Sequence, residues 1–300
     1  MKIKMQEGEI ASALNFPHSK VGFIGDTVDD RGQAALDYLK SKGLECHSVR
    51  YDPDEFTVRL DDAVIHADDM DSALKDYAAH SIVLEASTLG FVEIFLCCRS
   101  LRQLGASQVH LLYVEPGDYS RSMRRSVLLS KRDFELSEEV LGYRAFPGAA
   151  VLLTEKRPQR GVFFLGYEER RIDQALEDYQ MIQASRCMVI FGVPAFKPGW
   201  EMDAFVNNIR VIRDKHIRGG IKFCGAENPS AVFNLLSEVY DSREPEEMLF
   251  IAPIGTKPHG IGVALFVATH EDVGIIYDHP IRRKGRSQAV SRWHLFSADL

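Results

Sequence analysis

Short apolar runs alternate with amphipathic segments over the first 117 residues. Runs such as KVGFIG are rich in β-branched and aromatic residues and predict strands, whereas GQAALDYLKSKG has the apolar spacing of a helix that ends at Gly43. The predicted elements are strands at 20–25, 44–51, 82–86 and 108–116, and helices at 32–43, within 52–80 and at 91–105. This alternation predicts a parallel sheet that is covered on both faces.

The same rhythm starts again after residue 160. Asn228 is placed as the N-cap of a helix. The predicted strands are 161–166, 187–194, 221–226, 248–254 and 273–280. The predicted helices lie within 167–182, 204–216, 228–242 and 261–270. Residues 118–160 interrupt the pattern, and we interpret them as a basic connector with a strand in AVLLTE.

The two halves resemble each other. GFIGDTVDDRGQAALDYL and FFLGYEERRIDQALEDYQ both run from a strand through glycine and an acidic-acidic-Arg turn into an amphipathic helix, with Asp29-Asp30-Arg31 matching Glu168-Glu169-Arg170. Ser87-Thr88 likewise aligns with Gly255-Thr256. A repeated unit predicts an internal duplication into two α/β halves, each with a parallel sheet. The expected boundaries are 1–117, 118–160 and 161–300, although any two βαβ units share part of this likeness.

The turn IGTKPHG, between a buried strand and an apolar helix, carries the clearest candidate chemistry. Gly255 permits a sharp turn, and Thr256 can cap a helix or bind a phosphate. Lys257 adds a charge at a helix N-terminus that itself attracts anions, and His259 titrates near neutral pH. The turn matches neither the P-loop nor the GxGxxG pattern. An anion site and a simply capped turn with an exposed lysine both fit these residues.

Over about 30 residues, 248–278, the stretch IAPIGTKPHGIGVALFV resembles the GGTKxM-type turn and helix of CARF domains, the CRISPR-associated Rossmann-like fold. Gly255, Thr256 and Lys257 match that pattern, whereas Ile254 stands for its first glycine and His259 for an apolar residue. Together with the duplication, the resemblance implies an α/β fold of two Rossmann-like parallel-sheet halves that form an internal pseudo-dimer. It further implies a pocket for a cyclic oligonucleotide, lined by Gly255–His259 and by Ser87, Thr88 and Gly90 of the other half. It also implies a role in antiviral defence.

Two further groups follow strand ends, where open parallel sheets bind ligands. Gly25, Asp26 and Thr27 follow one strand, and Gly166 and Glu168 follow its counterpart. Their backbone amides are candidates for holding phosphate or ribose. Asp26 with Asp29 and Asp30 can instead hold Mg²⁺ for phosphoryl hydrolysis, or the acids can simply complement helix dipoles.

A third group lies on the loop GVPAFKPGWEM. Lys197 lies between Phe196 and Trp200, so an aromatic ring and a lysine are available to stack a base and hold its phosphate. Packing of these aromatics onto the sheet is an equally good interpretation.

Basic stretches follow both predicted closing strands, at Arg121–Arg132 and Arg282–Arg286. They are candidates for local contact with nucleic acid or a protein partner, and a solvated surface is the commoner explanation.

Composition narrows the classes of function. The net charge is −7, so no global basic field recruits nucleic acid. The five cysteines include no CxxC pair, which argues against a disulfide framework or structural zinc. The N-terminus lacks a signal-peptide pattern and no apolar run is long enough for a membrane span, so we expect a cytoplasmic protein.

Three functions stay open on this reading. The first is a nucleotide-binding sensor or adaptor, with no certain cofactor. The second is a phosphodiesterase that degrades such a ligand, with Lys257, His259 and Asp26 as catalytic candidates and Mg²⁺ only in this case. The third is a non-enzymatic subunit of a defence complex.

Overall fold

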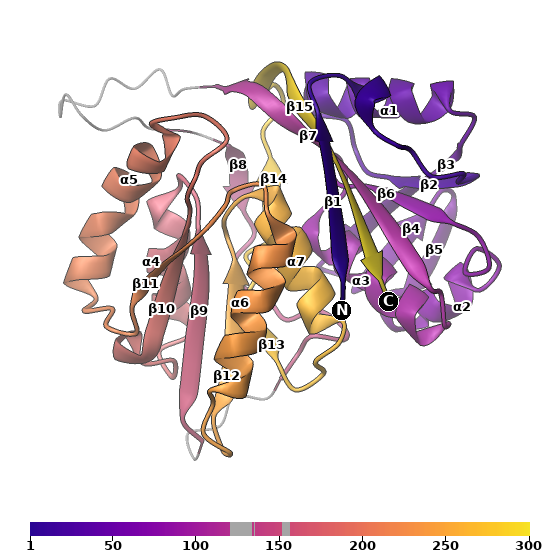
Figure 1. The fold of residues 1–300 in the computed structure, drawn as a ribbon. Helices are drawn as coiled ribbons and strands as arrows, with labels where there is room; N and C mark the ends of the chain where they lie inside the picture. Colours follow the sequence, from indigo (N-terminus) through magenta and orange to yellow (C-terminus); the bar gives the residue numbers. More distant parts are fainter. Residues whose placement is uncertain (121–133, 135, 152–156) are drawn as a thin grey trace. The chain divides into compact units, whose positions relative to one another are not determined.

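The structure is a computed structural model that describes residues 1–120, 134, 136–151 and 157–300. The chain divides into two compact units (Figure 1). Unit 1 comprises residues 1–119, 146–148 and 283–300, and unit 2 comprises 120–145 and 149–282. The basic stretch Arg121–Arg132 and residues 152–155 of the predicted strand AVLLTE lie outside the described residues.

Unit 1 is built on an eight-stranded mixed sheet in the order β1-β15-β7-β6-β2-β3-β4-β5. Its strands are β1 (Ile3–Gly8), β2 (Val21–Ile24), β3 (Glu45–Asp52), β4 (Thr57–Leu60), β5 (Ala63–His66), β6 (Ile82–Glu85), β7 (Gln108–Tyr119) and β15 (Ser287–Asp299). Its α-helices are α1 (Asp30–Ser41), α2 (Met70–Leu74) and α3 (Phe91–Gln103), with 3₁₀ turns at Ala11–Ala13 and Ala67–Asp69.

The prediction of an all-parallel sheet was wrong for unit 1. Only β7, β6, β2 and β3 run parallel, while β1, β15, β4 and β5 pair antiparallel with their neighbours. The helix expected within 52–80 is confirmed at α2 and at the 3₁₀ turn Ala67–Asp69, whereas residues 57–66 form the hairpin β4–β5 instead. In this hairpin, Thr57-Val58 and Val64-Ile65 supply β-branched residues on either side of the Asp61-Asp62 turn.

The chain's C-terminal segment completes unit 1 instead of unit 2. β15 pairs along almost its whole length with β7, from Ser287 opposite Tyr119 to Asp299 opposite Gln108, and β1 pairs on its other side. The second half expected over 161–300 therefore loses its last 18 residues to unit 1, because residues 283–300 belong there. A pairing between segments so far apart in sequence leaves no local signal.

Unit 2 holds a five-stranded parallel sheet in the order β11-β10-β9-β12-β13. Its strands are β9 (Gln159–Leu165), β10 (Cys187–Gly192), β11 (Ile221–Cys224), β12 (Met248–Pro253) and β13 (Gly274–Ile275), and a separate ladder joins β8 (Ser137–Val140) to β14 (Pro280–Arg282). Its α-helices are α4 (Glu169–Asp178), α5 (Trp200–Asp214), α6 (Pro229–Asp241) and α7 (Lys257–Val267), with a 3₁₀ turn at Ala184–Arg186. The predicted alternation of strands and helices is confirmed in this unit.

Helices cover both faces of the unit 2 sheet. α4 and α5 pack together on one face, over a core that includes Phe163, Val189 and Phe191, and α6 packs beside α7 (Figure 1). The predicted cap is confirmed, because the Asn228 side chain accepts a hydrogen bond of 2.8 Å from Ala231 N at the start of α6. Unit 1 has its own core, in which Leu39 of α1 packs with Val83 and Leu112 of the sheet.

Candidate functional site

The carboxyl ends of β9 and β12 form the centre of the candidate site in unit 2. In chain order the strands β9, β10, β11 and β12 occupy sheet positions 3-2-1-4, so the order reverses between β9 and β12. Open α/β sheets bind ligands at such a reversal. Gly166 follows β9 and lies against the end of β12, because a Cβ there would be 3.1 Å from Ile254 O. The sheet topology therefore brings two predicted turns together.

The IGTKPHG turn is a capped helix start, as predicted. Thr256 is the N-cap of α7, and its hydroxyl accepts from His259 N at 3.3 Å while donating to Ala226 O at 2.6 Å. Lys257 is the first helical residue, and Pro258 follows in the first turn, where its missing N–H costs little. Residues 255–257 are half-buried, whereas Ile254 and Pro258 are buried, so only this short piece reaches the surface.

His259 lies beneath the turn and is completely buried. Its Nε2 is 3.0 Å from Gly225 O, to which it donates as the neutral imidazole, and its ring lies 5.3 Å from that of Phe164. Burial lowers its pKa to about 4, although hydrogen bonds to backbone carbonyls oppose the shift. Within the described part of the chain, Nδ1 has no hydrogen-bond partner, and a Cβ added at Gly255 would lie 3.0 Å from it.

This location changes the chemistry available to His259. A ring without solvent exposure and with a pKa near 4 is uncharged at neutral pH, so His259 offers a hydrogen-bond acceptor at Nδ1 rather than a cation. Its contacts reach β9 through Phe164 and the turn after β11 through Gly225. The histidine therefore ties strand ends together under the candidate site.

A buried ion pair stands beside the turn and was not predicted. Arg171 of α4 binds Asp278 through two bonds, Nε to Oδ2 at 2.5 Å and Nη2 to Oδ1 at 2.6 Å, and its Nη1 donates to Ile254 O at 3.2 Å. Burial opposes the charge on Arg171, but the pair with Asp278 outweighs it and raises the arginine pKa. The acidic-acidic-Arg pattern at 168–170 pointed to the neighbouring Arg170, which is exposed.

Glu168 is half-buried and already engaged by the protein. Its carboxylate accepts from Leu136 N at 3.2 Å, from Ser137 N at 3.1 Å and from the Ser137 hydroxyl at 3.1 Å, and Arg171 lies 3.9 Å away. These bonds join the start of α4 to the start of β8. Glu168 thus orders the local chain around Gly166.

The aromatic loop after β10 packs back onto unit 2. Trp200, the first residue of α5, is 6% exposed and makes an edge contact with Tyr167 at 6.4 Å. Lys197 Nζ lies 5.3 Å above the Trp200 ring. The two predicted residues are together, but the indole is already covered by protein, which leaves little of it for stacking a base.

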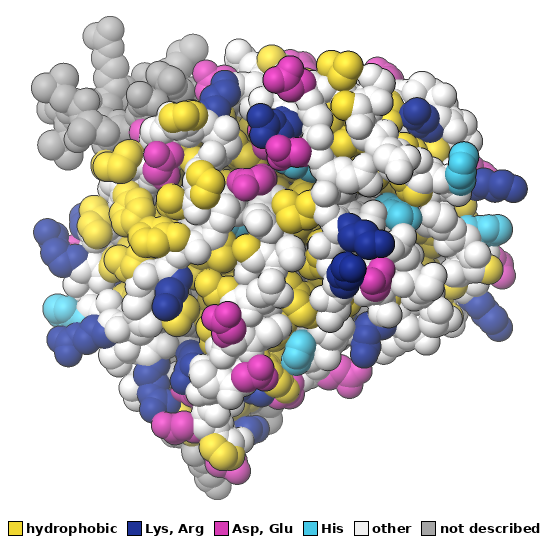
Figure 2. Space-filling model, viewed as in Figure 1, with side chains coloured by type: hydrophobic (Ala, Val, Ile, Leu, Met, Phe, Trp, Pro, Cys, Tyr) yellow, Lys and Arg dark blue, Asp and Glu magenta, His cyan; other side chains and the backbone are white. Residues whose placement is uncertain are grey.

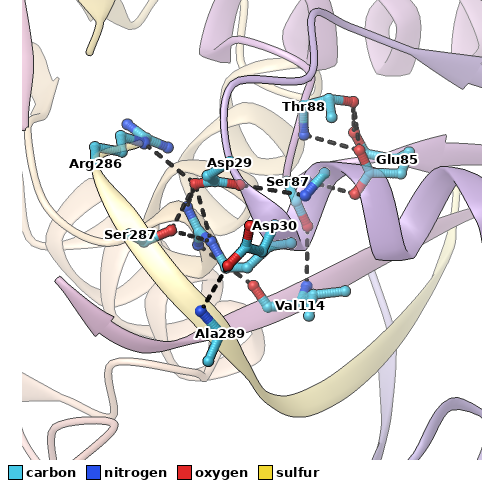
Figure 3. A network of polar contacts seen from close by, with 11 residues as sticks. Asp29, Asp30, Glu85, Ser87, Thr88, Val114, Arg286, Ser287 and Ala289 are labelled. Carbon is cyan, nitrogen blue, oxygen red and sulfur yellow. Dashed lines mark hydrogen bonds and ion pairs between the residues drawn. The ribbon is translucent and has the colours of Figure 1, made fainter. Parts of the chain in front are cut away.

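The STLG turn of unit 1 closes on itself around a buried acid (Figure 3). Glu85, the last residue of β6, has no solvent exposure and accepts 2.8 Å bonds from Ser87 N and Thr88 N and a short bond from the Thr88 hydroxyl. Burial raises the pKa of Glu85, although these hydrogen bonds oppose the shift. Ser87 and Thr88 are themselves buried, and Ser87 Oγ accepts from Val114 N at 3.0 Å.

Gly25 lies against the STLG turn in the same way as Gly166 lies against the IGTKPHG turn. Gly25 N donates to Thr88 Oγ1 at 2.9 Å, and a Cβ on Gly25 would lie 2.3 Å from Thr88 O. Asp26 and Thr27 are exposed, and Asp26 is 3.6 Å from Arg50. Gly90, the N-cap of α3, lies so close to Glu93 that a Cβ would be 2.1 Å from its carboxylate.

Asp29 centres a second polar network in unit 1 (Figure 3). Its carboxylate accepts from Arg31 Nη2 at 2.7 Å, from the Ser287 hydroxyl at 2.6 Å and from Gly32 N at 3.2 Å. Burial by itself would raise the Asp29 pKa, but Arg31 and these hydrogen bonds lower it. Arg286, from the second predicted basic stretch, lies 3.8 Å from Asp29.

In this network the Asp29-Asp30-Arg31 motif makes contacts that hold unit 1 together. Arg31 is 2% exposed and donates to Val114 O at 3.4 Å and to Ser287 Oγ at 2.9 Å. Asp30 accepts from Ala289 N at 3.0 Å. The motif therefore fastens α1 to β7 and β15, and Asp26 lies apart from it on the surface.

The described residues were also searched for metal-binding clusters and for membrane-spanning helices. No cluster of three or more His, Cys, Asp or Glu side chains with metal-binding geometry occurs among the described residues. None of the helices in that part of the chain has the length and apolar character that a membrane crossing requires.

No protein-family model matches the chain, and no curated protein matches it.

Proposed function

We propose that unit 2 binds a nucleotide through its phosphate at the carboxyl edge of the parallel sheet, between Gly166 and the Gly255–Lys257 turn. The observation that carries the proposal is the strand order, which reverses between β9 and β12 where these two turns meet. Both turns are partly exposed, whereas the strands that lead into them are buried.

The chemistry of this edge suits an anion. The N-terminus of α7 carries partial positive charge, and Lys257 at its first position adds a full one. Gly166 and Gly255 have no side chains, so they leave the backbone of both turns open to a ligand. His259 lies buried behind Gly255 and supports the turn without reaching its surface.

The equivalent turn of unit 1 is a poor anion site by the same reasoning. Glu85 lies under it, Ser87, Thr88 and Leu89 are buried, and Leu89 stands where unit 2 has Lys257. This turn therefore offers a phosphate neither a lysine nor exposed backbone between Ser87 and Leu89. We therefore place the ligand in unit 2.

The resemblance of IAPIGTKPHGIGVALFV to CARF domains supports a cyclic oligonucleotide as the ligand and a sensor or adaptor in antiviral defence as the role. Parallel features in the two units support a duplication. In each, the glycine after β2 or β9 touches the turn after a neighbouring parallel strand. An inward-facing arginine of the next helix contacts the residue after a tyrosine, through the backbone oxygen of Val114 after Tyr113 or the side chain of Asp278 after Tyr277. An internal pseudo-dimer is part of this proposal.

Isothermal titration calorimetry of the full chain with cyclic oligoadenylates and with common mono- and dinucleotides tests the proposal. Loss of one charge-assisted contact costs about 1.5–3 kcal/mol, so Lys257→Ala should weaken binding about tenfold or more. Lys20→Ala, which removes an exposed lysine of unit 1, should leave affinity unchanged. Failure of every nucleotide to bind the wild-type chain would refute the proposal.

Chromatography of the ligand after incubation with the protein separates binding from turnover. The phosphodiesterase alternative predicts linear products, and an intact ligand with and without Mg²⁺ would eliminate it. Of its catalytic candidates, Asp26 belongs to unit 1 and is exposed, while His259 is buried and neutral in unit 2.

A further inference from the structure

Exposed apolar side chains gather on one edge of unit 2. Figure 2 shows them over α5 and β11, and they include Met202, Val206 and Ile209 of α5, which are 60%, 37% and 48% exposed. Ile221 and Phe223 of β11 are 39% and 53% exposed. Single exposed apolar residues are ordinary, but a contiguous group marks an interaction surface. We call these five residues the α5–β11 surface.

The helical part of this surface is a continuous stripe. Residues 202, 206 and 209 have the i, i+4, i+7 spacing that places side chains on one face of a helix. Phe205, which lies beside the stripe, stacks on Phe191 of the core at 4.1 Å and also approaches Phe223 at 5.9 Å. The ring of Phe223 therefore lies on the α5 side of the sheet, next to the stripe.

The strand part of the surface is an open edge. β11 is the last strand of the parallel sheet and pairs on one side with β10, from Ile221 opposite Val189 to Cys224 opposite Gly192. No strand of the described residues lies along its other side. Such an edge presents backbone N–H and C=O groups in register for another strand, and apolar side chains on it favour pairing.

We infer that the α5–β11 surface is where a second copy of this chain docks, with the two β11 strands antiparallel around a two-fold axis at Lys222. Such an arrangement is self-complementary, as a two-fold interface requires. It places Ile221 opposite Phe223 of the other copy twice over, and aromatic with β-branched residues are favourable cross-strand pairs. It also brings the two α5 stripes together on the same face of the joined sheets.

Charge placement agrees with antiparallel packing of α5. Arg210 is exposed near the C-terminal end, where Arg213 already pairs with Asp214, so Arg210 supplies the net positive charge there. Glu201 lies near the N-terminal end. Antiparallel packing sets the basic end of one helix beside the acidic end of the other instead of bringing like charges together. Parallel packing would instead place the two basic ends beside each other and the two acidic ends beside each other.

Lys222 opposes this pairing and supplies its most specific test. At the two-fold axis it lies opposite its own copy, and like charges directly opposite in a ladder are destabilising. The lysine is exposed, so water and salt screen the repulsion. Docking through β11 therefore predicts a dimer that tightens when the charge at residue 222 is removed, whereas contact through α5 alone predicts no change.

Sedimentation velocity of the full chain over a wide range of concentration measures the dimer directly. We expect a reversible dimer for the wild type, and Val206→Glu should weaken it about a hundredfold by burying an unpaired charge. Met202→Glu should act in the same direction. The matched control is Val64→Glu in β5 of unit 1, where the valine is 55% exposed, and it should change nothing.

Lys222→Thr should tighten the dimer about two- to fivefold, the effect of one relieved cross-strand repulsion. Far-UV circular dichroism establishes that each variant is folded. A wild-type chain that stays monomeric at every concentration overturns the inference and leaves the surface to a different partner. A dimer that is insensitive to Val206→Glu and Met202→Glu, or to Lys222→Thr, overturns it as well.

Discussion

The buried His259 predicts a specific acid sensitivity of unit 2. Its folded pKa is about 4 against a reference of 6.5, so the unfolded chain takes up a proton more readily than the folded one. Stability from this residue is therefore fully present above pH 6.5 and is lost as the pH falls toward 4. The depressed value follows from burial of the ring under the IGTKPHG turn, where an imidazolium has no compensating acid among the described contacts.

The magnitude follows from the difference between the two pKa values. Relative to pH 7, the free energy of unfolding should fall by about 2 kcal/mol at pH 5 and by about 3 kcal/mol at pH 4 through His259 alone. Other groups also titrate over this range, so the effect is isolated by subtraction. His259→Gln keeps an N–H donor for Gly225 O but does not titrate, so its unfolding free energy should lack this component.

The assay can follow unit 2 separately, because each unit holds one tryptophan, Trp293 in unit 1 and Trp200 in unit 2. In a Trp293→Phe background, urea denaturation followed by Trp200 fluorescence gives the free energy at each pH, with and without His259→Gln. The result expected is a difference between the two chains that widens by about 3 kcal/mol from pH 7 to pH 4. Equal pH dependence in both chains would refute the argument that His259 is buried and neutral.

Two further predictions concern the buried contacts behind the turns. Asp278→Asn leaves the Arg171 guanidinium without its carboxylate and should destabilise unit 2 by about 3–5 kcal/mol in the same Trp200 assay; Asp214→Asn, at an exposed pair with Arg213, is the control and should cost less than about 1 kcal/mol. Gly25→Ala places a Cβ 2.3 Å from Thr88 O, and we expect unit 1 to lose about 1–3 kcal/mol, measured by Trp293 fluorescence in a Trp200→Phe background. Gly43→Ala, a site with open space but a φ of +76°, should cost less than Gly25→Ala, and the opposite order would contradict the close approach that we describe.

Local sequence determined the elements that the site uses. β-branched and aromatic runs specify β9 and β12, and Gly255-Thr256-Lys257-Pro258 specifies a sharp turn and a capped helix start, because backbone freedom, hydroxyl capping and proline tolerance are properties of a few neighbouring residues. The same holds for Asn228 at the start of α6. The hairpin β4–β5 was not predicted, although both of its strands contain adjacent β-branched residues, Thr57-Val58 and Val64-Ile65.

Tertiary structure alone decided which of these elements meet. Gly225 and Ala226, which follow β11, approach the turn, and Asp278, between β13 and β14, reaches it through Arg171. The residues around position 256 contain no signal for these contacts. The C-terminal strand β15 joins β7 across more than half of the chain, which only burial of the whole sheet can select. Arg171 rather than Arg170 reaches inward to Asp278, because the packing of α4 on the sheet decides which of two adjacent arginines lies on the covered side of the helix. The sequence thus specified the turn and its charge by short-range chemistry, whereas the neutral state of His259 depends on how the remote segments close around it.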